Sequence, residues 1–396
     1  MLKNKRIILG ISGGIAAYKM ANVASMLVKL GADVHVIMTE AATHFITPQT
    51  FEVLTKNKCY VDIFERDGNI HVPHVTLATT ADAFLIAPAT ADVVGKIANG
   101  IADDMLTSTI LPALCPVIIA PSMNVHMYEN KIVQSNIDKL KSFGYEIIEA
   151  ASGYLACGDV GKGKLPSEEI LVDYILKACA KEKDLAGKNI LVTAGPTKES
   201  IDPVRYITNH STGKMGYAIA KMAMLRGANV TLVTGETNIT PPSFVDVVKV
   251  ISAKDMYEAV TSRRDSQDII IKSAAVADYR PINVAEDKIK KSDGDMSIPL
   301  ERTDDILAYL GANKKPGQFI CGFSMETQNM LENSRAKLVK KNVDMIAANN
   351  LKQEGAGFGT DTNIITLITK DEVVELPMLS KDAVADSILD AILSNV

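Results

Sequence analysis

The 396-residue sequence contains no tryptophan, and aromatic residues make up only 5% of it. Surfaces that bind single-stranded nucleic acid stack bases on aromatic side chains, so this composition weakens the case for such a surface. The formal net charge is −5, from 42 basic and 47 acidic side chains. A mildly acidic chain argues against a nucleic acid or an anionic membrane as its partner.

Long apolar runs and paired cysteines are also missing. No segment approaches the roughly 18 uninterrupted apolar residues that a membrane span needs. The run Ile7–Ile11, which follows a basic amino terminus, is too short for the core of a signal peptide. The five cysteines lie far apart and contain no C-x-x-C pair, which is typical of cytosolic thiols rather than a disulfide framework. We therefore expect a cytoplasmic protein.

The first apolar run opens a pattern that predicts a β-α-β unit. Ile7–Ile11 ends in Ser12-Gly13-Gly14, and a helical pattern then covers residues 15 to about 30. Val34–Met38 forms the next apolar run. Two buried parallel strands need a crossover, usually a helix, and glycines mark its corners.

The same pattern returns in the second half. The apolar run Asn189–Thr193 leads to a helical stretch from about 213 to 226, and Val230–Val233 follows. Leu30-Gly-Ala-Asp-Val34 and Arg226-Gly-Ala-Asn-Val230 have the form of one joint built twice. We therefore predict an α/β protein with two Rossmann-like domains in tandem, each with a doubly wound, mainly parallel sheet.

The domain boundary is expected in the charged segment Ala178–Gly187. The second β-α-β unit carries a polar insertion, Thr197–Asn209, between its first strand and its helix. This position is the carboxyl edge of a parallel sheet, where open α/β sheets bind ligands, so a functional role for the insertion is favoured. The pattern at Ser380–Leu393 predicts a closing amphipathic helix.

Three strand ends in the first half carry candidate binding residues. Ser12-Gly13-Gly14 is either a plain tight turn or a phosphate site on backbone N–H groups, and it does not match the dinucleotide fingerprint G-x-G-x-x-G. Ala87-Pro-Ala-Thr-Ala91 and Ala120-Pro-Ser-Met-Asn124 follow two further apolar runs. Their small residues would let a planar ring approach the backbone, where Thr90 and Asn124 can form hydrogen bonds.

Two histidines and one cysteine are candidate acid–base groups. His71 and His74 bracket a Val-Pro pair, and the spacing does not decide between a structural role and a base that works near neutral pH. Cys157 lies in Gly153–Gly163, a glycine-rich segment that we interpret as a mobile flap with a reactive thiol or acid.

Over about residues 1–180 these features resemble the flavin-containing cysteine decarboxylases, and more closely the phosphopantothenoylcysteine decarboxylases. The resemblance is carried by five segments: Gly13–Ala17, His74–Leu77, Ala87–Ala91, Pro121–Tyr128 and Ala156–Asp159. It implies FMN-dependent oxidative decarboxylation, with His74 as the base, Asn124 binding the leaving carboxylate and Cys157 donating a proton. The FMN-binding residues that it implies are Ser12, Gly13, Gly14, Thr39, Ala87, Pro88, Ala89, Thr90 and Met123.

The second half contains polar segments at strand ends but no Walker motif. Ser211-Thr-Gly213 is either a helix cap or an anion site, with Arg205, Asn209 and Lys214 nearby. Asp278, which follows an apolar run and small residues, could hold Mg²⁺ beside phosphate oxygens. Lys288-Ile-Lys-Lys291 is either a solvated charge run or a phosphate clamp.

Residues 186–396 resemble the phosphopantothenate–cysteine ligases. The phrase from Gly195-Pro-Thr through Ile201-Asp-Pro-Val-Arg205 to Gly216 carries the resemblance. It implies that a nucleotide activates the carboxylate of 4′-phosphopantothenate, with CTP expected and ATP left open, before cysteine attacks through its amine. Asn209 would contact the acyl intermediate, Lys288 would assist activation, and Asp278 would hold Mg²⁺. The nucleotide-binding residues that it implies are Ser211, Gly213, Ala274, Ala275, Asp278, Lys288, Phe323, Lys337 and Lys341.

The two resemblances together predict a fused enzyme of coenzyme A synthesis. The ligase domain, residues 186–396, would make phosphopantothenoylcysteine, and the decarboxylase domain, residues 1–180, would convert it to 4′-phosphopantetheine. The resemblance also implies a homo-oligomer with trimeric decarboxylase and dimeric ligase domains. Two alternatives from other classes are a nicotinamide-dependent oxidoreductase, which lacks its fingerprint here, and a non-catalytic flavin-binding regulator that uses only the first half.

Overall fold

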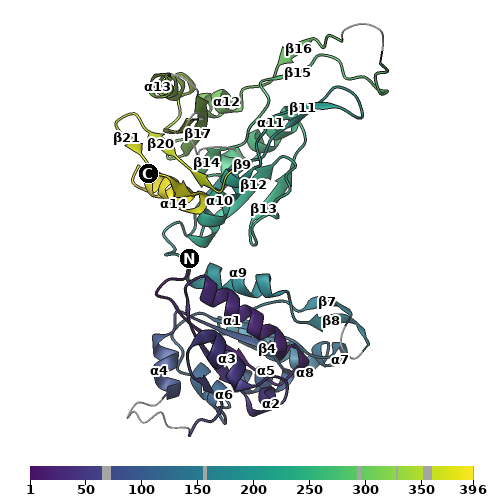
Figure 1. Cartoon of the computed structure of the whole chain (residues 1–396), viewed down its shortest axis with the longest axis vertical. Helices are drawn as coiled ribbons and strands as arrows, with labels where there is room; N and C mark the ends of the chain where they lie inside the picture. Colours follow the sequence, from purple (N-terminus) through teal and green to yellow (C-terminus); the bar gives the residue numbers. More distant parts are fainter. Residues whose placement is uncertain (65–72, 155–157, 292–295, 327–328, 351–358, 396) are drawn as a thin grey trace. The chain divides into compact units, whose positions relative to one another are not determined.

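The computed structural model describes residues 1–64, 73–154, 158–291, 296–326, 329–350 and 359–395. The chain divides into two compact units, Met1–Glu182 and Lys183–Val396 (Figure 1). Among the described residues, no helix is both long and apolar enough to cross a bilayer.

The first unit is built on a parallel sheet of six strands in the order β3-β2-β1-β4-β5-β6. The strands are β1 (Arg6–Ile11), β2 (Asp33–Met38), β3 (Cys59–Tyr60), β4 (Ala83–Ala89), β5 (Val117–Pro121) and β6 (Glu146–Ile147). The strand order reverses between β1 and β4, and such a reversal opens a crevice for ligands at the carboxyl ends of the strands.

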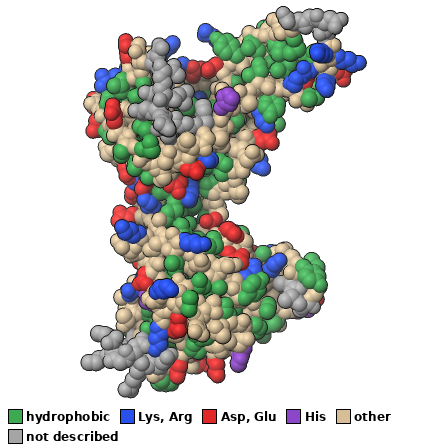
Figure 2. All heavy atoms as spheres, viewed as in Figure 1, with side chains coloured by type: hydrophobic (Ala, Val, Ile, Leu, Met, Phe, Trp, Pro, Cys, Tyr) green, Lys and Arg blue, Asp and Glu red, His purple; other side chains and the backbone are tan. Residues whose placement is uncertain are grey.

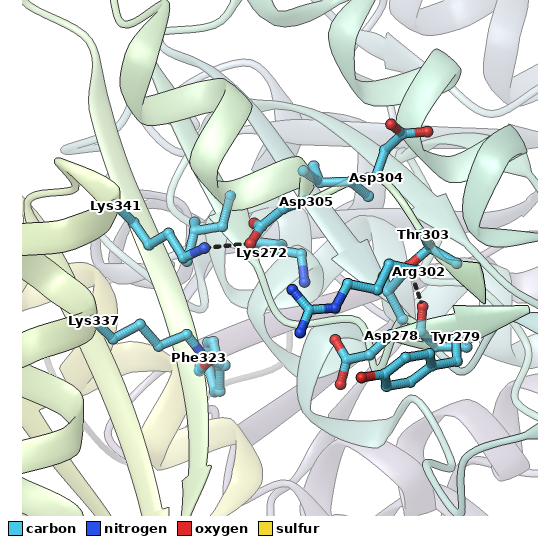
Figure 3. A pocket seen from close by; sticks show the side chains of 14 residues that line it. Lys272, Asp278, Tyr279, Arg302, Thr303, Asp304, Asp305, Phe323, Lys337 and Lys341 are labelled. Carbon is cyan, nitrogen blue, oxygen red and sulfur yellow. Dashed lines mark hydrogen bonds and ion pairs between the residues drawn. The ribbon is translucent and has the colours of Figure 1, made fainter. Parts of the chain in front are cut away.

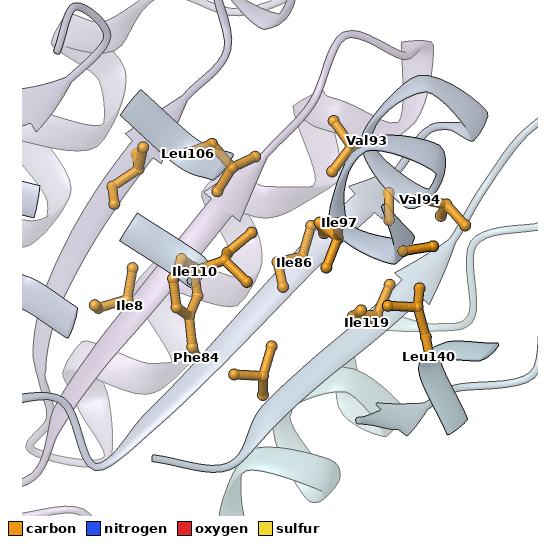
Figure 4. Close-up of a cluster of buried hydrophobic side chains, with 14 of the residues drawn as sticks. Ile8, Phe84, Ile86, Val93, Val94, Ile97, Leu106, Ile110, Ile119 and Leu140 are labelled. Atoms are coloured by element: carbon orange, nitrogen blue, oxygen red, sulfur yellow. The ribbon is translucent and has the colours of Figure 1, made fainter. Parts of the chain in front are cut away.

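Helices cover the sheet of the first unit, and an antiparallel hairpin of β7 and β8 follows it. These elements are η1 (Ile15–Lys19), α1 (Met20–Lys29), α2 (Glu40–Thr43), α3 (Pro48–Thr55), α4 (Pro73–Thr80), α5 (Ala91–Ala98), α6 (Met105–Ile110), α7 (Val125–Tyr128), α8 (Lys131–Ser142), β7 (Ala151–Tyr154), β8 (Val160–Lys164) and α9 (Glu168–Cys179). Figure 4 shows Phe84 and Ile86 of β4 facing Ile97, Leu106 and Leu140 of three helices. Fully burying such a side chain contributes about 1.5–3 kcal/mol, so this core fixes the sheet that carries the site.

The second unit repeats the strand order and adds two antiparallel strands at one edge, giving β13-β12-β9-β14-β17-β18-β20-β21. The strands are β9 (Asn189–Ala194), β12 (Asn229–Thr234), β13 (Asp246–Lys249), β14 (Ile269–Lys272), β17 (Phe319–Glu326), β18 (Met345–Asn350), β20 (Ile365–Ile368) and β21 (Val373–Glu375). The helices are α10 (Lys214–Leu225), α11 (Ala253–Thr261), η2 (Arg264–Ser266), α12 (Ile306–Ala312), α13 (Met330–Lys341) and α14 (Lys381–Leu393).

Three small two-stranded ladders complete the second unit. They are β10 (Lys198–Ser200) with β11 (Tyr206–Thr208), β15 (Tyr279–Pro281) with β16 (Leu300–Arg302), and β19 (Thr362–Asn363) with β22 (Leu379–Ser380). The first of these lies in the polar insertion 197–209. In Figure 1 the ladder of β15 and β16 extends away from the large sheet as an arm.

The predicted fold class is confirmed, because both units are doubly wound around a mainly parallel sheet. The two similar segments, Leu30–Val34 and Arg226–Val230, share one backbone conformation, because Gly31 and Gly227 both adopt φ +92° after a helix. This left-handed conformation favours glycine. The helix predicted from Ile15 differs from the structure, because its first turn, Ile15–Lys19, is a 3₁₀-helix that precedes α1.

Candidate active sites

Ser12 joins the ends of β1 and β4 in the first unit. Its buried Oγ donates a hydrogen bond to the carbonyl of Pro88 (2.6 Å) and accepts one from the N–H of Thr90 (2.9 Å). The side chain therefore binds two backbone groups of the protein. It holds the turn after β1 and the turn after β4 in one arrangement at the crevice.

The two glycines after Ser12 serve different purposes. A Cβ at Gly13 would lie 2.5 Å from the Cβ of Ala41, so only glycine fits there. A Cβ at Gly14 would meet nothing closer than Thr90, at 3.7 Å, because Gly14 faces a cavity of about 300 Å³. The cavity is lined by Gly13, Gly14, Ile15, Ala16, Thr90, Ser122, Met123, Asn124, Met127 and Gly163. A ligand in it can approach bare backbone at the Gly14 turn.

The β7–β8 hairpin borders this cavity. The N–H of Met123 donates to the carbonyl of Gly163 (3.0 Å), and a Cβ at Gly163 would lie 2.4 Å from the oxygen of Met123. The amide of Asn124 donates to the carboxylate of Asp159 (2.8 Å), and its oxygen accepts from the N–H of His126 (2.8 Å). The segment interpreted as a flap is therefore a hairpin on both of its described sides, packed against the loop after β5.

Within a single chain, five of the residues predicted for the first site line this cavity: Gly13, Gly14, Thr90, Met123 and Asn124. Ser12 does not line it, but its side chain binds the backbone of Thr90, which does. Thr39 instead caps α2, accepting from the N–H of Ala42 at 3.3 Å. Ala87, Pro88 and Ala89 belong to β4 and do not line the cavity.

Of the acid–base candidates of the first unit, the structure describes His74. His74 stands at the start of α4, half-buried, and its buried Nδ1 has no hydrogen-bond partner. It does not line the cavity. Cys157 and His71 lie outside the described residues.

The second unit has a cavity of about 420 Å³ that we call the α12 cavity, because the amino end of α12 forms part of its wall. Its lining residues are Lys272, Val276, Ala277, Asp278, Tyr279, Arg302, Thr303, Asp304, Asp305, Ile306, Leu307, Phe323, Lys337 and Lys341. Figure 3 shows Lys341 reaching from α13 and Arg302 from β16 toward the space beside Lys272. Cationic and carboxylate side chains from separate elements thus line the same cavity.

Burial and neighbouring charges shift the pKa values of Asp305 and Lys272 in the α12 cavity. Burial would raise the pKa of Asp305, but the ammonium of Lys341 and the N–H of Ala308 hold it below its usual value. Burial lowers the pKa of Lys272 to about 8, and the neighbouring charge of Lys337 contributes. The ammonium of Lys337 donates to the carbonyl of Phe323 (2.9 Å). An anionic ligand here would meet several cations and would favour the protonated form of Lys272.

A second cavity, of about 310 Å³, adjoins the first, and we call it the α10 cavity. The two cavities share Lys272, Val276, Asp278, Phe323 and Lys337. The remaining lining residues are Asn209, Ser211, Thr212, Gly213, Lys214, Met215, Gly216, Ser273, Ala274, Ala275, Met325, Asn349, Asn363 and Lys381. A ligand that fills both would pass along the shared wall.

Buried threonines set the loop between the cavities. Thr193 accepts from the N–H of Ala274 (3.0 Å), and Thr197 accepts from the N–H of Ala277 (3.0 Å). The exposed side chain of Asn209 donates to the carbonyl of Ala275 (2.9 Å). Asn209 and the small residues after β14 therefore meet at one place.

Lys288 does not line either cavity of its own chain. The buried carboxylate of Asp202 accepts from the N–H of Ile289 (3.2 Å), and Arg205 donates to the Ile289 carbonyl (2.5 Å). Lys288 itself is exposed. Figure 2 shows Lys and Arg side chains gathered toward the far end of the β15–β16 arm.

Sequence reasoning missed several cavity residues. Lys272 ends an apolar run, and a lysine at the end of a buried strand was the signal that could have revealed it. Arg302 and Lys381 carry no comparable local signal, whereas Asn349 stands at the polar end of a buried strand, as Lys272 does. Among the described residues no group of three or more His, Cys, Asp or Glu side chains forms a metal site, so Asp278 would need ligands from elsewhere.

Both halves match known families. Residues 185–396 match the family described as DNA/pantothenate metabolism flavoprotein C-terminal domain, and residues 1–180 match the family described as flavoprotein. The coenzyme A biosynthesis bifunctional protein CoaBC of Bacillus subtilis is 50% identical over 396 residues, 99% of this chain and 97% of that protein. Its namesake from Vibrio cholerae is 45% identical over 393 residues, 99% and 98% of the two chains. A crystal structure of a CoaBC C-terminal domain is 48% identical, covers 53% of this chain and 96% of its own, and has a TM-score of 0.46.

Proposed function

This chain belongs to the family of bifunctional coenzyme A biosynthesis proteins, and from that premise we propose how its two units divide the work. The chain is a flavoprotein enzyme with ligase and decarboxylase activities. We assign the decarboxylase to residues 1–180 and the ligase to residues 186–396. The observation that carries the assignment is that each unit has its own cavity at the carboxyl edge of its sheet, and each cavity has different chemistry.

The first cavity fits FMN. Gly14 leaves bare backbone beside Thr90, where a side chain would intrude, and this is the kind of cradle that admits a phosphate or a planar ring. When bound, FMN supplies the oxidation of the cysteine side chain, after which the carboxylate is easily lost. In this proposal Ser12 holds the turn at which Gly13 and Gly14 orient the flavin, and the amide of Asn124 binds the leaving carboxylate.

The proton transfers of decarboxylation are assigned to His74 and Cys157. Because His74 lies outside the cavity of its own chain, its role as a base requires a second copy in the homo-oligomer that we propose, with trimeric decarboxylase and dimeric ligase domains. Cys157, in the segment between β7 and β8, would return a proton to the product.

The histidine assignment is tested with His74→Asn in the full chain, next to His44→Asn, which changes an exposed histidine at the end of α2. We expect His74→Asn to keep its FMN absorption and to lose CO₂ release from phosphopantothenoylcysteine, while His44→Asn retains both. Unchanged CO₂ release in His74→Asn would contradict the assignment.

In the ligase unit, the α12 cavity suits a nucleoside triphosphate, for which we propose CTP. Lys272, Arg302 and Lys341 supply positive charge for the phosphates. A carboxylate oxygen of 4′-phosphopantothenate would attack the α-phosphorus, and pyrophosphate would leave. The amine of cysteine would then attack the acyl carbon beside Asn209, and the nucleoside monophosphate would leave.

Mg²⁺ fits this arrangement as a companion of the nucleotide. It is commonly held by one or two carboxylates, with phosphates and waters completing its shell. Asp278 and Asp304 line the cavity, whereas Asp305 is already paired with Lys341. Asp278 would therefore hold the ion together with the phosphates.

The ligase assignment is tested by following pyrophosphate from 4′-phosphopantothenate and cysteine with CTP or ATP. We expect turnover with CTP that requires Mg²⁺ and fails in Asn209→Ala at the amide-forming step. Intact ligation in Asn209→Ala would refute the role of that residue, and faster turnover with ATP would refute the choice of nucleotide. Cytoplasmic location is part of the proposal, since both substrates are small intracellular metabolites.

A further inference from the structure

The amide side chain of Asn124 is bonded at both of its ends in the first unit. Asn124 precedes α7, and its Oδ1 atom accepts from the N–H of His126 (2.8 Å). Its Nδ2 atom donates to the carboxylate of Asp159 (2.8 Å), the residue before β8. One end of the amide is therefore held by the helix that follows it, and the other by the β7–β8 hairpin.

These two neighbours leave the amide one orientation. A backbone N–H can only donate a hydrogen bond, and an ionised carboxylate can only accept one. If the amide turned over, its nitrogen would face the N–H of His126 and its oxygen would face the carboxylate of Asp159, so both hydrogen bonds would be lost. The chemistry of the two partners thus fixes the oxygen of Asn124 toward α7 and its nitrogen toward the hairpin.

Helix capping accounts for only one of these two bonds. An N-cap needs a side-chain oxygen that accepts from the first N–H groups of the helix, and serine or aspartate supplies it as well as asparagine does. The bond from the nitrogen of Asn124 to Asp159 adds nothing to this cap. It acts on a side chain that lines the cavity of the first unit, so its consequence is for a bound molecule rather than for the helix.

Other contacts also hold the hairpin in place. Further along β8, the carbonyl of Gly163 accepts from the N–H of Met123 (3.0 Å). A Cβ at Gly161 would lie 3.0 Å from both methyl carbons of Val125, so β8 packs closely against the loop after β5 and against α7. The bond between Asp159 and Asn124 therefore orients a side chain between two segments that are already in contact.

The orientation of this amide matters for a substrate that carries a carboxylate. An ionised carboxylate accepts hydrogen bonds and has no proton to donate, so it binds an amide nitrogen and is repelled by an amide oxygen. An asparagine that turned over freely would present either atom, and only one of them favours the substrate. Because the orientation of Asn124 is set before the substrate arrives, binding does not have to order the amide.

We propose that Asp159 is a positioning residue for the decarboxylation: its carboxylate holds the amide of Asn124 as a hydrogen-bond donor for the carboxylate that leaves. This inference rests on the proposed role of Asn124. Asp159 acts through that side chain and does not touch the reacting atoms. The same bond explains why position 124 has an amide, whereas the cap of α7 alone would be satisfied by a hydroxyl or a carboxylate.

The test compares Asp159→Ala with Asp138→Ala in the full chain, because Asp138 is an exposed aspartate of α8. CO₂ release gives the KM for phosphopantothenoylcysteine, and inhibition by 4′-phosphopantetheine gives the affinity for a product that lacks the carboxylate. We expect the KM of Asp159→Ala to rise about 10- to 100-fold, as for a lost charge-assisted contact. FMN absorption should persist, and the inhibition constant of the product should change by less than about twofold. In Asp159→Asn, whose amide oxygen can still accept, the KM should rise less, and Asp138→Ala should behave as the unchanged protein.

Asn124→Ser separates this inference from the function on which it rests, since serine keeps an oxygen for the cap but has no amide nitrogen. It should lose CO₂ release, and adding Asp159→Ala should not weaken its binding of phosphopantothenoylcysteine any further in calorimetry. Intact CO₂ release in Asn124→Ser refutes the proposed role of Asn124 itself. If Asn124→Ser is inactive, the inference alone fails when Asp159→Ala leaves the KM unchanged, weakens product binding equally, or adds in full to Asn124→Ser. Should Asp159→Ala not fold, Asp159→Leu fills a similar space without an acceptor, and the same rise in KM is expected; an unchanged KM there overturns the inference.

Discussion

Ser12→Ala should destabilise the first unit and weaken its hold on FMN. The substitution removes the hydroxyl that accepts from the N–H of Thr90 (2.9 Å) and donates to the carbonyl of Pro88 (2.6 Å). Pro88 keeps a contact from the backbone N–H of Ser12 (3.3 Å), so the N–H of Thr90 is the group left without its partner. This bond is part-buried, and leaving such a donor unsatisfied costs about 1–3 kcal/mol.

A loss of about 2 kcal/mol shifts the folding equilibrium by about 30-fold. For a unit of this size it lowers the melting temperature by about 4–8 °C. The assay is thermal unfolding followed by circular dichroism, with flavin fluorescence reporting FMN release. FMN should dissociate at a lower temperature, because the turns after β1 and β4 are no longer held together.

Ser142→Ala is the matched control. Its hydroxyl donates to the carbonyl of Lys139 (2.7 Å) at an exposed helix end, where water replaces a lost hydrogen bond. We expect a change within about 0.5 kcal/mol. If Ser12→Ala melts within about 1 °C of this control and retains FMN equally well, the reasoning about the buried hydroxyl is refuted.

Three further outcomes are expected. Because burial lowers the pKa of Lys272 to about 8, nucleotide binding above that pH should be accompanied by uptake of a proton. The uptake is measured by calorimetry in buffers of different ionisation enthalpy. Lys272→Met should abolish it, and equal uptake in the variant would contradict the prediction. Gly163→Ala places a Cβ 2.4 Å from the oxygen of Met123, so it should abolish CO₂ release and leave ligation intact. Gly144→Ala is the control, also at positive φ but in open space, and should retain both activities. Intact decarboxylation in Gly163→Ala would refute the prediction. Arg226→Met breaks ion pairs to three aspartates. The free energy of unfolding of the second unit, measured in denaturant, should fall by about 1–3 kcal/mol, and this loss should be smaller in high salt. An unchanged unfolding midpoint would contradict the prediction.

The strands were predictable because parallel strands buried on both faces are continuous apolar runs. The predicted runs Ile7–Ile11 and Asn189–Thr193 lie within β1 and β9. The start of the first helix was less predictable. Gly14 supplies no side-chain cap, and the chain enters α1 through a 3₁₀ turn, a common feature of helix starts.

The small ladders were not foreseen. β15 and β16 pair Tyr279–Pro281 with Leu300–Arg302 across a long connection, in which the turn signal Asp293-Gly294 stands far in sequence from both strands. Their three-residue strands are too short for an alternating pattern to stand out. Arg302 lines the α12 cavity because β16 pairs with β15. Its position in the site could therefore not be predicted from the sequence.

By itself, the sequence determined the fold class and the residue types at the carboxyl ends of strands, because buried runs, glycine joints and polar strand ends are local patterns. Only the tertiary structure decided which of these residues meet. It placed Ser12 between two turns rather than toward a ligand, kept His74 and Lys288 away from the cavities of their own chain, and set Lys381 beside Lys214. The physical reason is that cavities are made by packing between elements distant in sequence, and no local pattern records that packing.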